Sequence, residues 1–188
     1  YFVIKGVEKV ILIQEQLSKN RVILEMDNKK CVSASITSST HERKSKAYII
    51  VKNKRVYMKN NTLGEDIPIT IILKAMGVES DLEMVQLVGS EPEIVNAMAL
   101  SMEEPVRLGI HTQMQALRYV GNKVRGRTQN NTWYRKPTSV EEEARDVLAN
   151  VVLSHVPVEN FDFRAKCIYV GHIVRRVLMV DMGQADLD

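Results

Sequence analysis

The most continuously apolar stretch of the chain runs from Ile67 to Met76, where only Thr70 and Lys74 are clearly polar. Because these two residues are four apart, they would share one face of a helix and leave the rest of its surface apolar. Asp66 is typical of a helix N-cap, and Pro68 is typical of a first helical turn. Gly77 can adopt the left-handed conformation that ends many helices. The pattern predicts a helix that is buried on most sides.

The residues before this helix have strand patterns. Between residues 31 and 39, Val, Ala and Ile alternate with Ser and Thr, which is typical of a half-buried strand. Further β-prone runs occupy residues 1–4, 10–13, 21–26, 47–51 and 56–58. The last two of these runs flank the polar residues 52–55, which we interpret as the turn of a hairpin.

The residues after Gly77 have helical periodicity. Helices are predicted over residues 80–88, 91–102, 112–124 and 139–155, and from a cap at Asn160 or Asp162 to about Val180. Ser139 with Glu142 three residues later forms a capping-box pattern, whereas Pro105 and Gly109 should interrupt the helical pattern. Residues 125–138 are predicted to form a loop. The expected fold class is α+β: a small, mostly antiparallel β portion followed by a bundle of about five helices.

Composition narrows the class of protein only slightly. The chain has 188 residues, 45% of them apolar, and a net charge of +3, which is compatible with a packed core and does not by itself indicate nucleic acid. Cys31 and Cys167 are far apart in the sequence and fit a reducing compartment. No apolar run approaches the ~20 residues that cross a bilayer. Because the chain begins without Met and ends in an acidic run, we expect it to be cut from a longer protein.

No residue pattern indicates a catalytic or metal site. The four histidines are not spaced as metal ligands, and His172 is expected to be a core or interface residue of the last helix. The consecutive acids Glu141 to Glu143 would splay around a helix and so would not converge on a substrate. In the first turn of the helix, their negative charges would interact favourably with the helix dipole. Cys167 is expected to be a buried structural thiol, since the sequence places no activating residue beside it. We therefore expect no cofactor in this segment.

Two basic stretches remain as candidates for contact with nucleic acid. Residues 41–59 contain seven Lys or Arg and one acid, and residues 118–136 contain six Lys or Arg, no acid, and three aromatic residues. Such charge attracts phosphates, and exposed aromatic rings can stack on bases, although both stretches could simply be solvated. The predicted contact residues are Arg118, Lys123, Arg125, Arg127, Arg135 and Lys136.

Several longer motifs occur in order along the chain: YFVIKGVEKV at 1–10, EDIPI at 65–69, KAMG at 74–77, FRAK at 163–166 and DLD at 186–188. The first resembles a segment of the second-largest, beta-like subunit of multisubunit DNA-directed RNA polymerases. The next three resemble the lobe domain of that subunit, and the last resembles the start of an acidic stretch that follows in the family. Within the family, the segments TQMQAL at 112–117 and GNKV at 121–124 resemble the RNA polymerase III form. The resemblance covers essentially the whole chain.

The resemblance implies a non-catalytic part of a nuclear enzyme. In the family the lobe forms a wall of the DNA cleft near downstream DNA, contacts other polymerase subunits including the largest, and docks an accessory heterodimer related to a general initiation factor. Magnesium and zinc are expected elsewhere in that assembly, and no membrane contact is implied. Residues 1–26 would be the edge of the protrusion domain, and residues 27–188 would be the lobe.

Two other classes of function stay open at this point. The chain could be a free-standing, non-specific nucleic-acid-binding protein that uses its basic stretches. It could also be a small enzyme whose site is assembled only by the fold.

Overall fold

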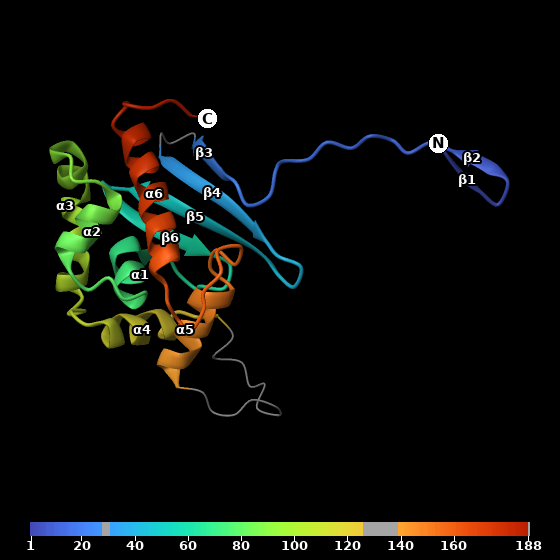
Figure 1. Ribbon diagram of the computed structural model, residues 1–188. Helices are drawn as coiled ribbons and strands as arrows, with labels where there is room; N and C mark the ends of the chain where they lie inside the picture. The colour runs from blue at the N-terminus through green and yellow to red at the C-terminus, as the bar shows by residue number, and fades with distance from the viewer. Residues whose placement is uncertain (28–30, 126–138, 188) are drawn as a thin grey trace.

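The computed structural model describes residues 1–27, 31–125 and 139–187 (Figure 1). β1 (Phe2–Ile4) and β2 (Val7–Lys9) form an antiparallel ribbon. A second, five-stranded sheet follows in sequence order, with every neighbouring pair antiparallel; its strands are β3 (Val22–Met26), β4 (Val32–Ser39), β5 (Lys44–Lys52), β6 (Arg55–Asn60) and β7 (Ile67–Pro68). The described residues then form six helices: α1 (Ile69–Ala75), α2 (Asp81–Val88), α3 (Pro92–Arg107), α4 (Gln113–Asn122), α5 (Val140–Asn150) and α6 (Arg164–Asp181). The predicted α+β class is confirmed.

One face of the five-stranded sheet is packed against helices. The alternation predicted for β4 is present, because Val32, Ala34 and Ile36 are buried while most of the intervening residues are partly exposed. Figure 1 shows α6 crossing this sheet, and α6 contacts both β4 and β5. The predicted hairpin turn is also confirmed, since Asn53 and Lys54 have φ angles of 51° and 60°, the left-handed values that a two-residue turn between twisted strands requires.

The central helix is shorter than predicted at its start. Ile67 and Pro68 pair with Met58 and Tyr57 as strand β7, so α1 begins only at Ile69. Asp66 was predicted to cap the helix, and this is wrong: its carboxylate accepts a hydrogen bond from Lys52 Nζ at 2.5 Å. The pairing with β6 thus overrides the local preference of Pro68 for a first helical turn.

The predicted end of α1 is confirmed. Gly77 has a φ of 108°, its N–H donates to the carbonyl oxygen of Lys74 at 3.0 Å, and the N–H of Val78 donates to that of Leu73 at 3.0 Å. This pair of bonds is the Schellman arrangement, in which a left-handed residue satisfies the last carbonyl groups of a helix.

All seven residues of α1 are buried, including the two polar ones. Thr70 Oγ1 donates to the carbonyl oxygen of Ser101 at 3.0 Å, and Lys74 Nζ donates to that of Glu79 at 2.9 Å. Because α1 contacts β6, β7, α3 and α4, it joins the sheet to the helices. Its polar face is thus satisfied inside the protein and not by solvent.

Two helix boundaries differ from the prediction for identifiable reasons. Pro105 lies inside α3 and does not break it. A proline there leaves the carbonyl group of Ser101 without its helical donor, and Thr70 supplies the missing hydrogen bond. α5 begins at the predicted capping box, where Ser139 Oγ accepts from the Glu142 N–H at 3.1 Å, but it ends at Asn150 and not near His155.

The early end of α5 coincides with a buried lysine of α6. Lys166 is fully buried, and its Nζ donates to the carbonyl oxygens of Leu148, Ala149 and Val152 at 2.8, 2.9 and 2.8 Å. A cation is favoured at the C-terminal end of a helix, where backbone carbonyl groups lack donors. Lys166 therefore caps α5 from a neighbouring helix.

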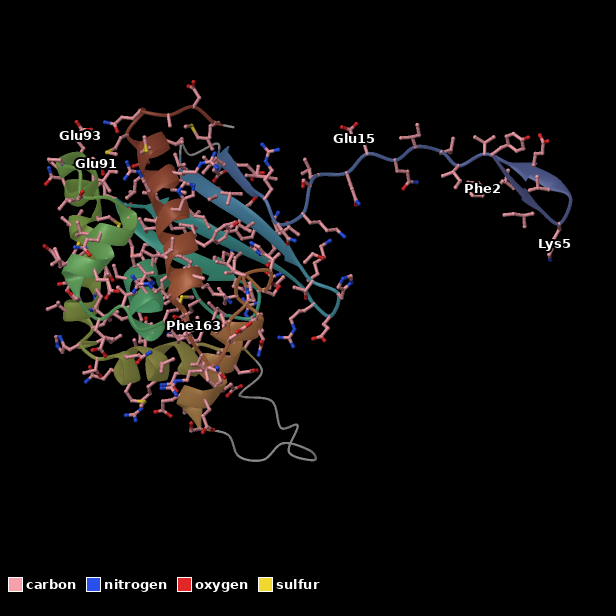
Figure 2. All side chains as sticks on the ribbon, viewed as in Figure 1. Phe2, Lys5, Glu15, Glu91, Glu93 and Phe163 are labelled. Carbon is pink, nitrogen blue, oxygen red and sulfur yellow. The ribbon has the colours of Figure 1, made fainter. Side chains whose placement is uncertain are left out.

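The N-terminal segment extends away from the rest of the molecule. Figure 2 shows Phe2, Lys5 and Glu15 along this segment, far from Phe163 at the start of α6. The strand predicted at residues 10–13 is absent, because no described residue pairs with these residues, and Ile13 is 99% exposed. β3, by contrast, pairs along its whole length with β4. The proposed boundary at residue 26 stays a prediction.

Candidate nucleic-acid interface

The three predicted contact residues that the structure describes lie on α4 or just after it. Arg118 lies on α4, Lys123 is its C-cap residue, and Arg125 follows one residue beyond a bridge between Leu63 and Val124. The other predicted contact residues lie outside the described residues; they are Arg127, Arg135 and Lys136. The aromatic residues Trp133 and Tyr134 lie there as well.

Two of the three described cations are paired with acids. Arg118 Nε lies 2.9 Å from a carboxylate oxygen of Glu141 on α5, and Lys123 Nζ lies 2.5 Å from one of Glu65. The hydrogen bond to Glu65 raises the pKa of Lys123. Both pairs are partly exposed, so each contributes little stability, but each also cancels a positive charge that a phosphate would need. Arg125 is exposed and forms no ion pair with any described residue.

The backbone around Arg125 is held by the loop that precedes α1. The N–H of Arg125 donates to the carbonyl oxygen of Thr62 at 2.8 Å, and that of Gly64 donates to the carbonyl oxygen of Lys123 at 2.7 Å. A side chain at Gly64 would bring its Cβ to 3.3 Å from the same oxygen, which is tight for residues larger than glycine. Arg125 is therefore presented to solvent from a fixed point of the backbone.

The other basic stretch, residues 41–59, lies on the hairpin of β5 and β6. Lys52 is paired with Asp66, and Arg55 Nε lies 3.0 Å from a carboxylate oxygen of Glu104. The three remaining lysines of the two strands, Lys44, Lys46 and Lys59, form no ion pair with any described residue. The predicted contact set left this stretch out. The sequence signal that could have included it is the alternation of Lys44, Lys46 and Tyr48, which places these side chains on one face of a strand.

One pair of side chains has the contact of a nucleophile and its base, but its surroundings make it structural. Ser38 Oγ and His155 Nδ1 are 2.6 Å apart. Ser38 is fully buried, and its Oγ also accepts from the backbone N–H of His155 at 3.0 Å. Burial, and then the charge of Lys166, lower the pKa of His155. Because no substrate can reach Ser38, the pair connects β4 to the segment after α5.

The other residues considered for chemistry also have structural surroundings. Cys167 is buried as predicted, and burial raises the pKa of its thiol to about 12, so the reactive thiolate is disfavoured. Glu142 caps α5 and Glu141 pairs with Arg118, as expected for acids that splay around a helix. His172 is exposed on α6, so it is not a core residue of this fold, and its alternative role at an interface stays a prediction. The described residues contain no cluster of three or more acidic, histidine or cysteine side chains suited to a metal ion.

A helix with the length and apolarity needed to cross a membrane is also absent from the described ranges.

Comparisons with known proteins point to one family. The family model described as RNA polymerase Rpb2, domain 2, matches residues 9–188. The chain is 50% identical over 194 aligned residues to "DNA-directed RNA polymerase III subunit rpc2" of Dictyostelium discoideum, covering 100% of the chain and 12% of that protein. It is 49% identical to "DNA-directed RNA polymerase III subunit RPC2" of Saccharomyces cerevisiae, covering 95% of the chain and 15% of that protein. A more distant match, 28% identical, is "DNA-directed RNA polymerase subunit Rpo2N" of Methanococcus vannielii, covering 97% of the chain and 36% of that protein.

Proposed function

The chain belongs to the RNA polymerase Rpb2 domain 2 family, and we propose from this premise that it is the lobe of the second-largest subunit of an RNA polymerase III-like enzyme. The family match over residues 9–188 is the observation that carries the proposal. The chain spans only 12% and 15% of the two polymerase III relatives named above. The nucleotidyltransferase activity would therefore belong to the assembled polymerase, and this segment would contribute no catalytic group.

Within that assembly, the end of α4 would face the DNA cleft. Arg125 supports this orientation, because it is exposed, held in place by Thr62 and free of any described acid. The neighbouring pairs Arg118–Glu141 and Lys123–Glu65 leave little net charge, which fits a weak contact with phosphates of downstream DNA and not base-specific binding. The contact would position DNA without reading its sequence.

A second surface would dock the accessory heterodimer. Val106 and Leu108 near the end of α3 are 62% and 48% exposed, and Met114 on α4 is 50% exposed. Exposed large apolar side chains that form a contiguous patch are typical of surfaces that another protein covers. This surface lies on helices whose other faces, including Met98, are packed into the core.

The N-terminal ribbon would meet a different partner. Its strands expose Phe2, Val3, Ile4 and Val7 by 53–63%, as expected if residues 1–26 form the edge of a protrusion domain that continues outside this chain. The largest subunit and the other polymerase subunits would be further partners. The enzyme would act in the nucleus, and its magnesium and zinc would be bound outside this segment.

Site-specific photocrosslinking in the assembled polymerase tests this arrangement. A photoreactive residue replacing Arg125 should crosslink to downstream DNA of a template-bound complex, whereas the same residue replacing Val106 should crosslink to an accessory protein subunit and not to DNA. Both positions are exposed, so each serves as the control for the other.

If Arg125 crosslinked only to protein and Val106 to DNA, the proposed orientation would be wrong. If neither position crosslinked to a polymerase component and the chain bound DNA tightly by itself, the free-standing nucleic-acid-binding alternative would be favoured instead.

A further inference from the structure

The face of the five-stranded sheet opposite the helices carries lysine, tyrosine and small hydroxyl side chains, together with Ile23, Glu25 and Ile50. Successive residues of a strand point to opposite faces. Ala47 and Ile49 of β5 are fully buried on the helix side, so Lys46 and Tyr48 lie on the other side, where both are partly exposed. Tyr57 of β6 is also partly exposed, and α3 reaches this second face only at Arg55, which pairs with Glu104.

Two tyrosines lie next to each other on this face. Tyr48 of β5 is directly opposite Lys59 of β6, and Tyr57 of β6 is directly opposite Ile50 of β5. Tyr48 and Tyr57 are therefore diagonal neighbours on adjacent strands, a relation in which Cβ atoms are ~7–8 Å apart or less and aromatic side chains are within reach of each other. Two rings placed in this way on a sheet can stack on successive bases of a single strand.

Unpaired lysines surround the two rings. Lys44, Lys46 and Lys59 share the face with the tyrosines and form no ion pair with any described residue. Lys46 Nζ lies 4.9 Å from the centre of the Tyr48 ring. Lys46 thus lies over the face of the Tyr48 ring, and the charges of Lys44 and Lys59 are available to phosphate groups.

On this face, the neighbouring strand β4 carries small side chains with hydroxyl groups. Thr37 is opposite Lys46, and Ser35 is opposite Tyr48 on one side and Ile23 of β3 on the other. Ser35 is only 3% exposed, although the strand alternation places it on this face. Thr37 is partly exposed, so its hydroxyl group can donate to or accept from bases and phosphates.

We propose that this open sheet face is a binding site for single-stranded nucleic acid. The lysines complement phosphates, and the adjacent rings favour bases that are not already stacked and paired, as they are in a duplex. An acidic protein segment could use the lysines, but it would gain no stacking on the tyrosines. None of these residues is among the predicted contact residues Arg118, Lys123 and Arg125.

Fluorescence anisotropy with the 188-residue chain tests the proposal. The probe is a labelled oligo(dT) of about 12 nucleotides, within the ~4–16 that a sheet-based single-strand site covers. We expect it to bind more tightly than a duplex of equal length. Three neutralised phosphates predict a log–log salt slope of about −2 for a single strand. Tyr57→Leu should weaken binding about ten-fold, whereas Tyr57→Phe, which keeps the ring, should bind as the unmodified chain does.

A matched pair of double variants separates this site from general electrostatics. Lys46→Gln with Lys59→Gln should weaken oligo(dT) binding at least about five-fold at low salt, while Arg118→Gln with Lys123→Gln, which removes the same charge, should have little effect. Far-UV circular dichroism verifies that each variant is folded. Equal weakening by both pairs, or no effect of Tyr57→Leu, would overturn the proposal. A polyglutamate peptide that competed as well as oligo(dT), with no dependence on the tyrosines, would instead identify a docking face for acidic protein.

Discussion

Ile71→Asp or Ile72→Asp should leave the chain unfolded under conditions in which the unmodified chain is folded. Both side chains are fully buried in α1, the helix that contacts β6, β7, α3 and α4. A carboxylate at either position would have no described partner. An unpaired buried charge costs at least several kcal/mol, against a total stability of about 5–15 kcal/mol for a typical domain.

Far-UV circular dichroism and urea unfolding measure this effect. Leu82→Asp is the matched control, since Leu82 lies on the neighbouring helix α2 and is 67% exposed. The control should unfold within about 0.5 kcal/mol of the unmodified chain, as surface substitutions usually do. If the two isoleucine variants stayed soluble with an unchanged spectrum, α1 could not occupy the centre of the core.

Lys166→Met should lower the free energy of unfolding by about 3 kcal/mol. The variant keeps a long unbranched side chain but removes the donor to three carbonyl groups at the end of α5. An unsatisfied buried acceptor costs about 1–3 kcal/mol, and relief from burying a charge offsets part of the sum. Lys74→Met is the control: it is also buried, but it donates to only one carbonyl group and lies near an exposed acid, so we expect about 1 kcal/mol.

The pH dependence of the free energy of unfolding, measured for the unmodified chain and for Lys166→Met, gives an independent readout. Burial lowers the pKa of Lys166 to about 8, below its value of about 10.4 in an unfolded chain. Between these values the unfolded chain binds more protons than the folded one, so this lysine makes stability rise with pH. The stability difference between the unmodified chain and Lys166→Met should therefore grow from pH 8 to pH 10. A smaller Lys166→Met effect than that of Lys74→Met would contradict the capping role, and no such growth would contradict the lowered pKa of Lys166.

Features decided by neighbouring residues could be predicted from the sequence. The left-handed end of α1 at Gly77, the capping box of Ser139 with Glu142 and the turn at Asn53 each depend on groups within a few residues of one another. The central burial of α1 was also visible, because its apolar residues surround the helix on most sides.

Features decided by distant residues could not be predicted in this way. Pro105 is accommodated within α3 only because Thr70 donates to the carbonyl group of Ser101. Asp66 does not cap α1, because Ile67 and Pro68 pair with β6 and Lys52 of β5 binds the Asp66 carboxylate. No spacing rule connects such residues before the fold brings them together.

The candidate nucleic-acid interface also has features that depend on neighbouring residues and features that depend on distant ones. The density of positive charge around Arg118 and Lys123 was evident in the sequence, but their partners Glu141 and Glu65 are 23 and 58 positions away. Which cations remain free for a phosphate therefore depends on the tertiary structure. The lysines of β5 could have been assigned to one face from their alternation, but the position of Tyr57 beside Tyr48 depends on the register between strands.

Nucleotide addition on an RNA–DNA scaffold tests most directly whether this chain is a non-catalytic module of an RNA polymerase. The full-length subunit that contains the chain should be affinity-purified in complex with the largest subunit, and this complex should extend the RNA. The 188-residue chain alone, folded by circular dichroism, should add no nucleotide at any magnesium concentration. Extension by the chain alone, or a full-length subunit that purifies as a free protein without polymerase activity, would contradict the assignment.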